Sequence, residues 1–448
     1  MGQLFGTDGI RGRANTYPMT CELAMKTGQA VGLFTRESGN RSVIIGRDTR
    51  VSGQMLESAL AAGISSTGVD VLLAGVIPTP GVAYLSSVVE GAGAGIVISA
   101  SHNPFYDNGI KIFKRGGIKL SDDQEEKIEV RILGEDIVPR EEVGKISVIT
   151  DGCGRYTGFL LEKFPFGKPD KKLKLVIDTS NGAAYECAGQ VFKADLFDTV
   201  FIHNQPDGKN INENCGSQHT GDVSALVLKE KADIGLAFDG DADRLIAVDD
   251  KGREITGDRI LAICAKYAKA RNSLGNNIVV STIMSNIGLV NALKTLNIDH
   301  EITDVGDRRV LERMQETNAT IGGEDSGHMI FLKEHTTGDG MLTALKLLEV
   351  MIGTGKSLSD LAEVMTVYPQ ILMNVEVDAS RPDFNKVPLI ADAIKEVETL
   401  LGEQGRVLVR YSGTQPLLRV MVEGPEVDIT RECCEKICQA VRESICKL

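Results

Sequence analysis

The chain has 448 residues, of which 42% are hydrophobic and 25% charged, and its formal net charge is −13. This length exceeds what one hydrophobic core supports, so three or four domains are expected. The acidic balance argues against nucleic acid or an anionic membrane as the main partner, while a local basic pocket for a small phosphate is compatible with it. No apolar run approaches the length of a bilayer span, and the opening MGQLFGTDGIRG lacks the apolar core of a signal peptide, so we expect a cytoplasmic protein.

The first part of the chain alternates between short apolar runs and helical patterns. Three strands are expected, RSVIIG (41–46), VDVLLAG (69–75) and GAGIVIS (93–99). A helix at 53–68 separates the first two, and Ser121 is expected to cap an acidic helix at 122–133. This strand–helix–strand order favours a largely parallel sheet with helices on its faces.

The same order recurs twice, and the pattern changes near residue 367. The second round comprises LKLVID (173–178), a helix over 182–194 and DIGLAF (233–238). The third comprises NIVVSTI (277–283), HEITDVG (300–306) and a helix at 307–316. The last part alternates ILMNVEVD (371–378), a helix around 385–401, RVLVRYSG (406–413), LLRVMVEG (417–424) and a final helix. We therefore predict three similar α/β domains with mixed, largely parallel sheets, plus a smaller C-terminal α+β domain.

The nine cysteines are odd in number and scattered along the chain. Four of them fall in the C-terminal helical stretch, Cys433, Cys434, Cys438 and Cys446. A cysteine metal site needs better-spaced partners, such as pairs separated by two residues, and the sequence has no such pairs. Reduced thiols are therefore expected throughout.

The stretch ISASHNP (98–104) follows a predicted strand with two serines and a histidine. Polar loops at the carboxyl ends of parallel strands are where open α/β sheets bind ligands, so Ser101 is a candidate nucleophile that needs a base or a metal for activation. The alternative is a polar turn that ends at Pro104. The nearby GAGAG precedes its strand, which argues against a dinucleotide-binding loop.

The stretch AFDGDADRLIAVDD carries alternating carboxylates at Asp239, Asp241 and Asp243. Packed together they would repel one another, and a divalent cation with oxygen ligands, Mg²⁺ above all, would relieve that repulsion. Arg244 occupies the sixth position, where a calcium-binding EF-hand requires glycine. Two alternatives remain, a solvated acidic turn and a phosphatase in which Asp239 is the nucleophile.

Two further stretches combine glycines with polar side chains. In IGGEDSGHM (321–329), Glu324, Ser326 and His328 alternate along a predicted extended loop, as groups that bind sugar hydroxyls would. A structural hydrogen-bonding role for the histidine is the alternative.

In RYSGTQPLLR (410–419), a turn of Ser412, Gly413 and Thr414 lies between Arg410 and Arg419. Successive backbone N–H groups with flanking guanidinium groups suit a phosphate, whereas a hairpin with surface arginines is the alternative. Together the four stretches supply a nucleophile, a metal site, a hydroxyl-binding loop and a phosphate clamp, which are the parts needed for metal-assisted phosphoryl transfer on a sugar.

Five motifs in this order resemble the signatures of the α-D-phosphohexomutase family along nearly the whole chain. They are GTDGIRG (6–12), SASHNP (99–104), DGDADR (239–244), GEDSGH (323–328) and RYSGT (410–414). FGTDGIRG, INENCGSQH (211–219) and RVMVEG (419–424) are most similar to members that interconvert glucosamine 6-phosphate and glucosamine 1-phosphate for UDP-N-acetylglucosamine synthesis. Members that act on glucose or mannose phosphates are the alternative, because Asp325, Tyr411 and Gln415 depart from the usual residues. A sensor without activity would be expected to lose the serine or an aspartate, and all are present.

The resemblance implies a phosphoserine enzyme with one Mg²⁺ per chain and a sugar 1,6-bisphosphate as intermediate and activator. It implies catalytic roles for Ser101, Lys111, Arg11 and His102. It implies metal binding by Ser101, Asp239, Asp241 and Asp243. It implies substrate binding by Glu324, Ser326, His328, Gly306 and Arg244, and phosphate binding by Arg410, Ser412, Gly413, Thr414 and Arg419. Homodimers are common in the family.

These roles would fall on separate domains. The expected division is 1–150 with the phosphoserine loop, 151–252 with the metal-binding loop, 253–367 with the sugar-binding loop, and 368–448 with the phosphate-binding turn.

Overall fold

The computed structural model describes residues 3–6, 8–134, 137, 140–167, 172–377, 382–412 and 416–445. The chain forms two compact units, Met1–Met284 with Ile298–Glu363, and Ser285–Asn297 with Val364–Leu448. The first unit holds three sheets and the second holds one. Within the described ranges, none of the helices combines the length and hydropathy that crossing a bilayer requires.

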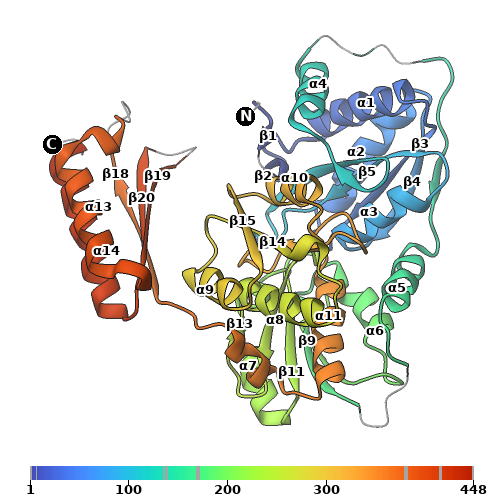
Figure 1. Ribbon diagram of the computed structural model, residues 1–448. Coiled ribbons are helices and arrows are strands. Elements are labelled where there is room, and N and C mark those ends of the chain that lie inside the picture. The colour runs from blue at the N-terminus through green and yellow to red at the C-terminus, as the bar shows by residue number, and fades with distance from the viewer. Residues whose placement is uncertain are drawn as a thin grey trace. The chain divides into compact units, whose positions relative to one another are not determined.

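The first sheet is mixed and carries the serine loop (Figure 1). Its strands are β1 (Phe5–Gly6), β2 (Gly9–Arg13), β3 (Ser42–Arg47), β4 (Asp70–Val76), β5 (Ala92–Ile98), β6 (Asp107–Lys114), β7 (Ile118–Lys119) and β8 (Ile146–Val148). The order is β1-β2-β6-β5-β3-β4-β8, with β7 paired to β6. β3, β4, β5 and β8 run parallel, and β6 returns antiparallel beside β5. This return places β6 side chains next to the carboxyl end of β5.

Helices cover both faces of this sheet. They are α1 (Cys21–Glu37), α2 (Gly53–Ser65), α3 (Thr79–Val88) and α4 (Asp122–Leu133). α1, α2 and α4 share one hydrophobic core with the strands. α3 packs on β3 and β5 at Gly46 and Gly95, where an added Cβ would meet Val82 or Ser86 closer than 3.0 Å. Ser121 stands before α4 as predicted, and its N–H donates to Gln124 Oε1 at 3.1 Å.

The second sheet has the order β10-β9-β11-β12-β13. Its elements are α5 (Gly152–Glu162), β9 (Lys174–Asp178), α6 (Ala184–Val191), β10 (Asp198–Ile202), η1 (Gly216–Gln218), α7 (Gly221–Glu230), β11 (Ile234–Phe238), β12 (Leu245–Asp249) and β13 (Glu254–Ile255). β9, β10 and β11 are parallel, and β11 forms an antiparallel hairpin with β12. The turn of this hairpin contains the three aspartates.

The third sheet has the order β15-β14-β16-β17 and the same plan of parallel strands ending in a hairpin. Its elements are α8 (Gly257–Ala270), η2 (Gly275–Asn277), β14 (Ile278–Thr282), β15 (Asp299–Thr303), α10 (Asp307–Thr317), β16 (Ile321–Gly323), β17 (Met329–Phe331), α11 (Gly340–Thr354), α12 (Leu358–Leu361) and η3 (Ala362–Val364). The predicted sugar-binding stretch is the β16–β17 turn.

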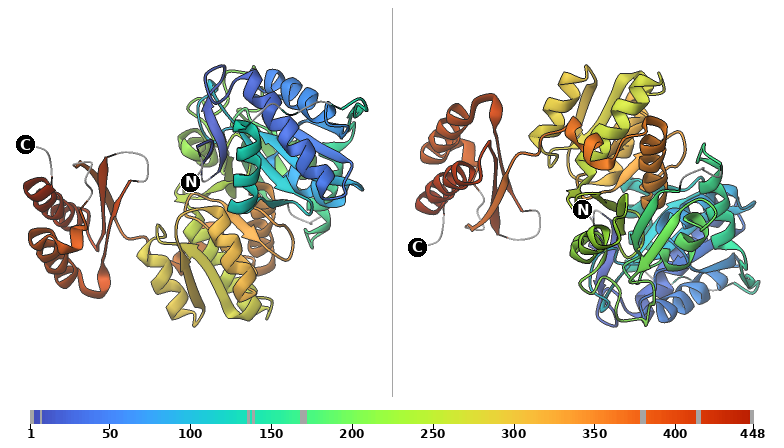
Figure 2. Two further views of the ribbon diagram at one scale, coloured as in Figure 1. Left: turned by 90° about the horizontal axis from the view of Figure 1, so that it is seen from above. Right: turned by 90° about the horizontal axis from the view of Figure 1, so that it is seen from below.

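The second unit is a three-stranded antiparallel sheet with two helices on one face (Figures 1 and 2). Its elements are β18 (Gln370–Glu376), η4 (Phe384–Lys386), α13 (Pro388–Leu401), η5 (Gly402–Gln404), β19 (Arg406–Tyr411), β20 (Leu417–Glu423) and α14 (Val427–Ile445), with α9 (Ile287–Thr295) from earlier in the chain. The N–H of Ile287 donates to the buried Glu423, which also pairs with Arg406 at 2.9 Å. The predicted fold class, three mixed α/β sheets and a smaller α+β domain, is confirmed.

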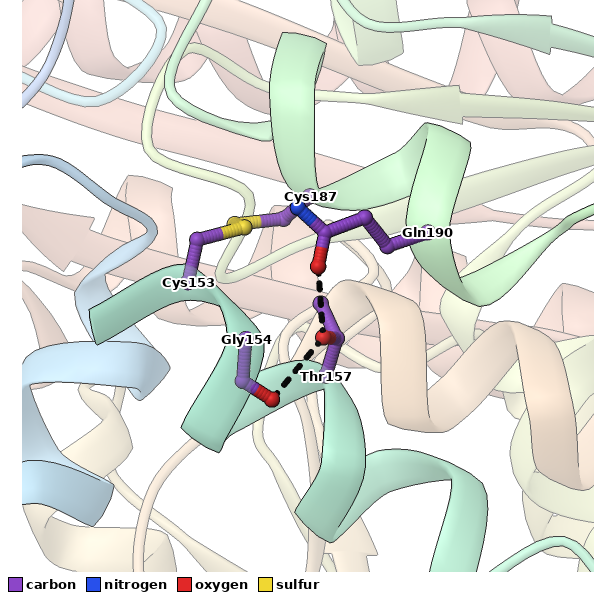
Figure 3. Close-up of a disulfide and its surroundings, with 5 residues drawn as sticks. All are labelled: Cys153, Gly154, Thr157, Cys187 and Gln190. Carbon is purple, nitrogen blue, oxygen red and sulfur yellow. Dashed lines mark hydrogen bonds between the residues drawn. A yellow bond between two sulfur atoms is a disulfide. The ribbon is translucent and has the colours of Figure 1, made fainter. Parts of the chain in front are cut away.

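A disulfide joins Cys153 on α5 to Cys187 on α6 (Figure 3). Next to it, Thr157 Oγ1 donates to Gln190 Oε1 at 3.0 Å, so the same two helices are also hydrogen-bonded. The expectation of reduced thiols throughout is therefore wrong for these two cysteines. They are 34 positions apart, and only the packing of α5 against α6 brings their Cα atoms to 5.8 Å.

Candidate active site

Ser101 lies in the turn between β5 and β6, at the carboxyl end of a buried parallel strand. Its φ angle is 52°, in the left-handed region that residues other than glycine rarely adopt, and the residue is 1% exposed. Its N–H donates to Ser99 Oγ at 3.0 Å, and its Oγ donates to Asp239 Oδ2 at 2.6 Å. The turn thus directs the serine hydroxyl at the first of the three aspartates.

Arg50, a buried residue that the sequence analysis missed, donates hydrogen bonds to the backbone of the serine turn. Arg50 Nε donates to Asp48 at 2.8 Å, and its other nitrogens donate to the carbonyls of Ser101 at 3.0 Å and Asn103 at 2.7 Å, and to that of Pro104. The available signal was GRDTR at 46–50, a run of charges directly after an apolar strand. Arg50 fixes the backbone on which the candidate nucleophile sits.

We expect Arg50→Met to lower the free energy of unfolding by about 3 to 5 kcal/mol, because Asp48 is left buried without its partner and the turn carbonyls lose their donor. Urea unfolding measures this loss. The matched control is Arg131→Met, which removes an exposed pair with Glu37 and should cost less than about 1 kcal/mol. Equal losses in the two variants would contradict the assigned role of Arg50.

Asp239, Asp241 and Asp243 lie in the β11–β12 turn, and one carboxylate oxygen of each lies within 4.8 Å of the other two. All three are buried. Burial, followed by repulsion from Asp243 and Asp241, raises the pKa of Asp239 well above its usual value. Asp241 Oδ1 and Asp243 Oδ1 are buried without a hydrogen-bond partner. Crowded carboxylates with unpartnered oxygens fit a divalent cation with oxygen ligands.

Lys111 comes from β6, which places it across the sheet from Val97. The side chain is 2% exposed, and Nζ lies 2.9 Å from Asp241, 3.4 Å from Asp243 and 3.1 Å from Asp8. Burial opposes its charge, but Asp241, Asp8 and Asp243 outweigh burial and raise the pKa of Lys111 well above its usual value. A proton donor therefore lies beside the aspartates, in contact with Asp241 and Asp243.

His102, Arg11 and Arg244 bring nitrogen donors to the same place. His102 Nδ1 lies 3.3 Å from Ser101 Oγ and 3.4 Å from an Arg244 nitrogen. Burial, then the two arginines, lowers the pKa of His102 to about 4, so this ring is neutral at pH 7. Arg11 Nε and Arg244 Nε are buried without hydrogen-bond partners, which suits a bound anion.

The predicted sugar-binding residues form a hairpin turn, so the expectation of an extended loop is wrong. Gly327, with φ of 90°, reverses the chain between β16 and β17. Glu324 Oε1 accepts from the Gly306 N–H at 3.1 Å, and its Oε2 accepts from Ser326 at 3.4 Å. A cavity of about 350 Å³ is lined by Leu4, Gly6, Asp8, Gly9, Arg11, Asp243, Arg244, Val305, Gly306, Asp307, Glu324 and His328. Its lining thus joins residues from all three sheets of the first unit.

The predicted phosphate clamp belongs to the second unit. Arg410 on β19 and Arg419 on β20 stand opposite each other, and the Ser412 N–H donates to the carbonyl of Leu417 at 2.8 Å. Arg419 Nε is buried without a hydrogen-bond partner. Gly413 and Thr414 lie outside the described residues.

A second group of donor atoms, from Asp178, His203 and Cys215, also gathers within 4.8 Å. The Asp178 oxygens already accept from His203 Nδ1 at 2.9 Å, from the Gly216 N–H at 2.8 Å and from the Ser180 N–H at 2.7 Å. Burial, together with Asp178, raises the pKa of Cys215 to about 12. The three hydrogen bonds to Asp178 tie His203 and the backbone at Ser180 and Gly216 to the end of β9, which is a structural role.

Comparison of the chain with known proteins identifies its family. The four domains described as phosphoglucomutase/phosphomannomutase domains I, II, III and C-terminal match residues 2–137, 155–252, 256–368 and 372–440. A phosphoglucosamine mutase of Desulforapulum autotrophicum is 59% identical over 99% of this chain and 100% of its own, and that of Syntrophus aciditrophicus is 53% identical over the same shares.

Among solved structures, a phosphoglucomutase/phosphomannomutase family protein of Burkholderia thailandensis is similar, with a TM-score of 0.81. It is 26% identical over 98% of this chain and 97% of its own. The chain therefore belongs to the phosphoglucomutase/phosphomannomutase family, the α-D-phosphohexomutases, and it is similar over its full length to phosphoglucosamine mutases of that family.

Proposed function

We propose that the chain is an isomerase that interconverts glucosamine 6-phosphate and glucosamine 1-phosphate, which supplies UDP-N-acetylglucosamine synthesis. The observation that carries this proposal is the buried Ser101 hydroxyl, which donates to Asp239 at 2.6 Å beside Asp241 and Asp243, each of which has a buried oxygen without a hydrogen-bond partner. The full-length likeness to phosphoglucosamine mutases supports the choice of an amino sugar.

The reaction runs through a phosphorylated Ser101. The phosphoryl group leaves Ser101 Oγ for a sugar hydroxyl, whose proton passes to a nearby base, and the product is a sugar 1,6-bisphosphate. After the bisphosphate turns end for end, its other phosphoryl group returns to Ser101, and a proton is given back to the freed sugar oxygen. Lys111 Nζ is the group proposed to carry this proton: it would accept the proton as a neutral amine and return it as an ammonium. A cation held by Asp241 and Asp243 would offset the carboxylate charge that raises the pKa of Lys111 in its absence.

Asp239, Asp241 and Asp243, with an oxygen on Ser101, are the residues proposed to hold one Mg²⁺ per chain. When bound, Mg²⁺ supplies positive charge that offsets the negative charge of the transferring phosphoryl group. The near-complete burial of Ser101 keeps water from competing with the sugar hydroxyl as acceptor.

The remaining residues orient the substrate. Glu324, Ser326 and His328 accept or donate to sugar hydroxyls, and Gly306 fixes Glu324 through its N–H. The nitrogens of Arg11, His102 and Arg244 take the phosphate at the reacting end. We propose the clamp Arg410, Ser412, Gly413, Thr414 and Arg419 for the other phosphate, because an anion nest accepts either end of a bisphosphate without reading the sugar.

The test compares kcat/KM for the 6-phosphates of glucosamine, glucose and mannose, with a catalytic amount of the matching 1,6-bisphosphate. We expect glucosamine 6-phosphate to be preferred by at least about tenfold, since the site must then be built around an amino group. Preference for glucose or mannose phosphate would replace the proposed substrate. No mutase turnover with any of the three would overturn the proposed reaction.

A further inference from the structure

Six buried or half-buried side chains, in which acidic and basic residues alternate, close into a ring beside the cavity. In order around this charge ring they are Asp8, Lys111, Asp243, His328, Asp307 and Lys119. Lys119 Nζ lies 2.6 Å from Asp8 Oδ1 and also pairs with Asp307. His328 closes the other side through longer contacts: Nε2, which accepts from the Gly338 N–H at 3.2 Å, lies 3.5 Å from Asp307, and Nδ1 lies 3.6 Å from Asp243. Lys111 completes the ring between Asp243 at 3.4 Å and Asp8 at 3.1 Å.

The ring draws on all three sheets of the first unit. Asp8 lies between β1 and β2, Lys111 on β6 and Lys119 on β7, all in the first sheet. Asp243 belongs to the β11–β12 turn of the second sheet. The third sheet contributes Asp307, the first residue of α10, and His328, just before β17. Three of these residues, Lys111, Asp243 and His328, have roles in the proposed reaction, and Asp8, Asp307 and Lys119 complete the ring.

Lys119 occupies a distinctive place in the ring. It is not among the residues that line the cavity, whereas its two partners Asp8 and Asp307 are. Its side chain is 9% exposed. Burial alone would raise the pKa of both carboxyl groups. Lys111 and Lys119 outweigh burial at Asp8, and Lys119 and His328 outweigh it at Asp307, so the pKa of each carboxyl is lowered. Lys119 therefore lies between two ionised carboxylates. Both carboxylates line the cavity, and Lys119 does not.

We propose that Lys119 and Asp307 are positioning residues of this site, Lys119 holding Lys111 in place through Asp8 and Asp307 holding Asp243 in place through His328. This inference rests on the proposed phosphoryl transfer at Ser101. The ring fixes the proton carrier and a metal-binding carboxylate relative to each other, although they come from different sheets. Outer partners of this kind orient the groups that bind metal and substrate.

The first experiment replaces Lys119 by Met. We expect kcat to fall about 10- to 100-fold with little change in KM. The reason is that Asp8, the counter-charge of Lys111, is no longer held by Lys119, while the residues that line the cavity are unchanged. Lys119→Arg keeps the charge and should recover most of the lost kcat. The matched control is Lys346→Met, since Lys346 likewise joins two carboxylates, Glu334 at 3.5 Å and Glu349 at 3.3 Å, away from the ring. The control should lose similar thermal stability and keep the wild-type kcat.

The second experiment tests whether the ring acts as one unit. If it does, Lys119→Met combined with Asp307→Asn should lose no more kcat than the worse single variant, whereas independent residues would multiply their losses. Calorimetric titration with Mg²⁺ alone gives a readout that needs no turnover. We expect Lys119→Met and Asp307→Asn each to weaken Mg²⁺ binding about tenfold.

Several results would overturn the proposal. They are a Lys119→Met kcat within about twofold of wild type, a loss no greater than that of Lys346→Met, or multiplicative losses in the double variant. If Lys119→Met does not fold, Asp307→Asn and Lys119→Arg provide the same comparisons. A wild-type protein without mutase activity would instead refute the proposed function, and the Mg²⁺ titrations would still test the ring.

Discussion

Ser101→Ala should lose mutase activity on the order of 10⁴-fold or more, because the alanine offers no oxygen to carry the phosphoryl group. The fold should survive. The removed hydroxyl makes a hydrogen bond to Asp239, and such a bond contributes roughly 1 kcal/mol to stability. Coupled-enzyme turnover measures the loss, and thermal unfolding monitors the fold.

The matched control for this variant is Ser87→Ala, an exposed serine on α3 that bonds only to the carbonyl of Tyr84. It should keep full activity. Mass spectrometry of the wild-type protein after turnover should find one phosphoryl group, located at Ser101. Near-normal turnover of Ser101→Ala without any phosphoserine would refute the role of this residue. A phosphoenzyme that is labile to hydroxylamine would point to Asp239 as nucleophile.

Removal of divalent metal should abolish turnover, and added Mg²⁺ should restore it. The physical reason is the crowding of Asp239, Asp241 and Asp243, whose buried oxygens cannot face a phosphoserine without an intervening cation. Dialysis against EDTA followed by stepwise addition of Mg²⁺ measures the effect. Full turnover in excess EDTA would exclude the proposed metal site.

A variant separates metal loss from general damage by the chelator. Asp241→Asn keeps the shape of the side chain but removes one negative charge, so calorimetry should detect Mg²⁺ binding weakened by more than about tenfold. Asp233→Asn is the control, since Asp233 only accepts from the Lys174 N–H at the far end of β9. Unchanged Mg²⁺ affinity in Asp241→Asn would contradict the assignment of this carboxylate.

The sequence was most informative where local pattern decides structure. Apolar runs placed β3 and β9 within a residue or two, and Ser121 marked the start of α4. The antiparallel returns were not foreseen. β6 is an example. It runs antiparallel to β5 because of the turn at Ser101, and the residue pattern does not predict the left-handed backbone of that turn.

The candidate site was foreseen through motifs, and its supporting residues were not. Ser101 and Asp239 are 138 positions apart, and the sequence suggested them separately as nucleophile and metal ligand. Arg50, Asp8 and Lys119 were missed, since a charged residue next to a strand is usually solvated. Their function depends on burial against partners from other sheets, which only the folded chain reveals.

The disulfide between α5 and α6 has a consequence for the unfolded chain. It joins two positions 34 apart, and the closed loop contains β9, the strand that pairs with both β10 and β11. A closed loop of this length has fewer open conformations, which in the chain-entropy account favours folding by roughly 3 to 4 kcal/mol. The reduction potential of its surroundings would therefore set how readily the second sheet comes apart, with no change at any residue that touches the sugar.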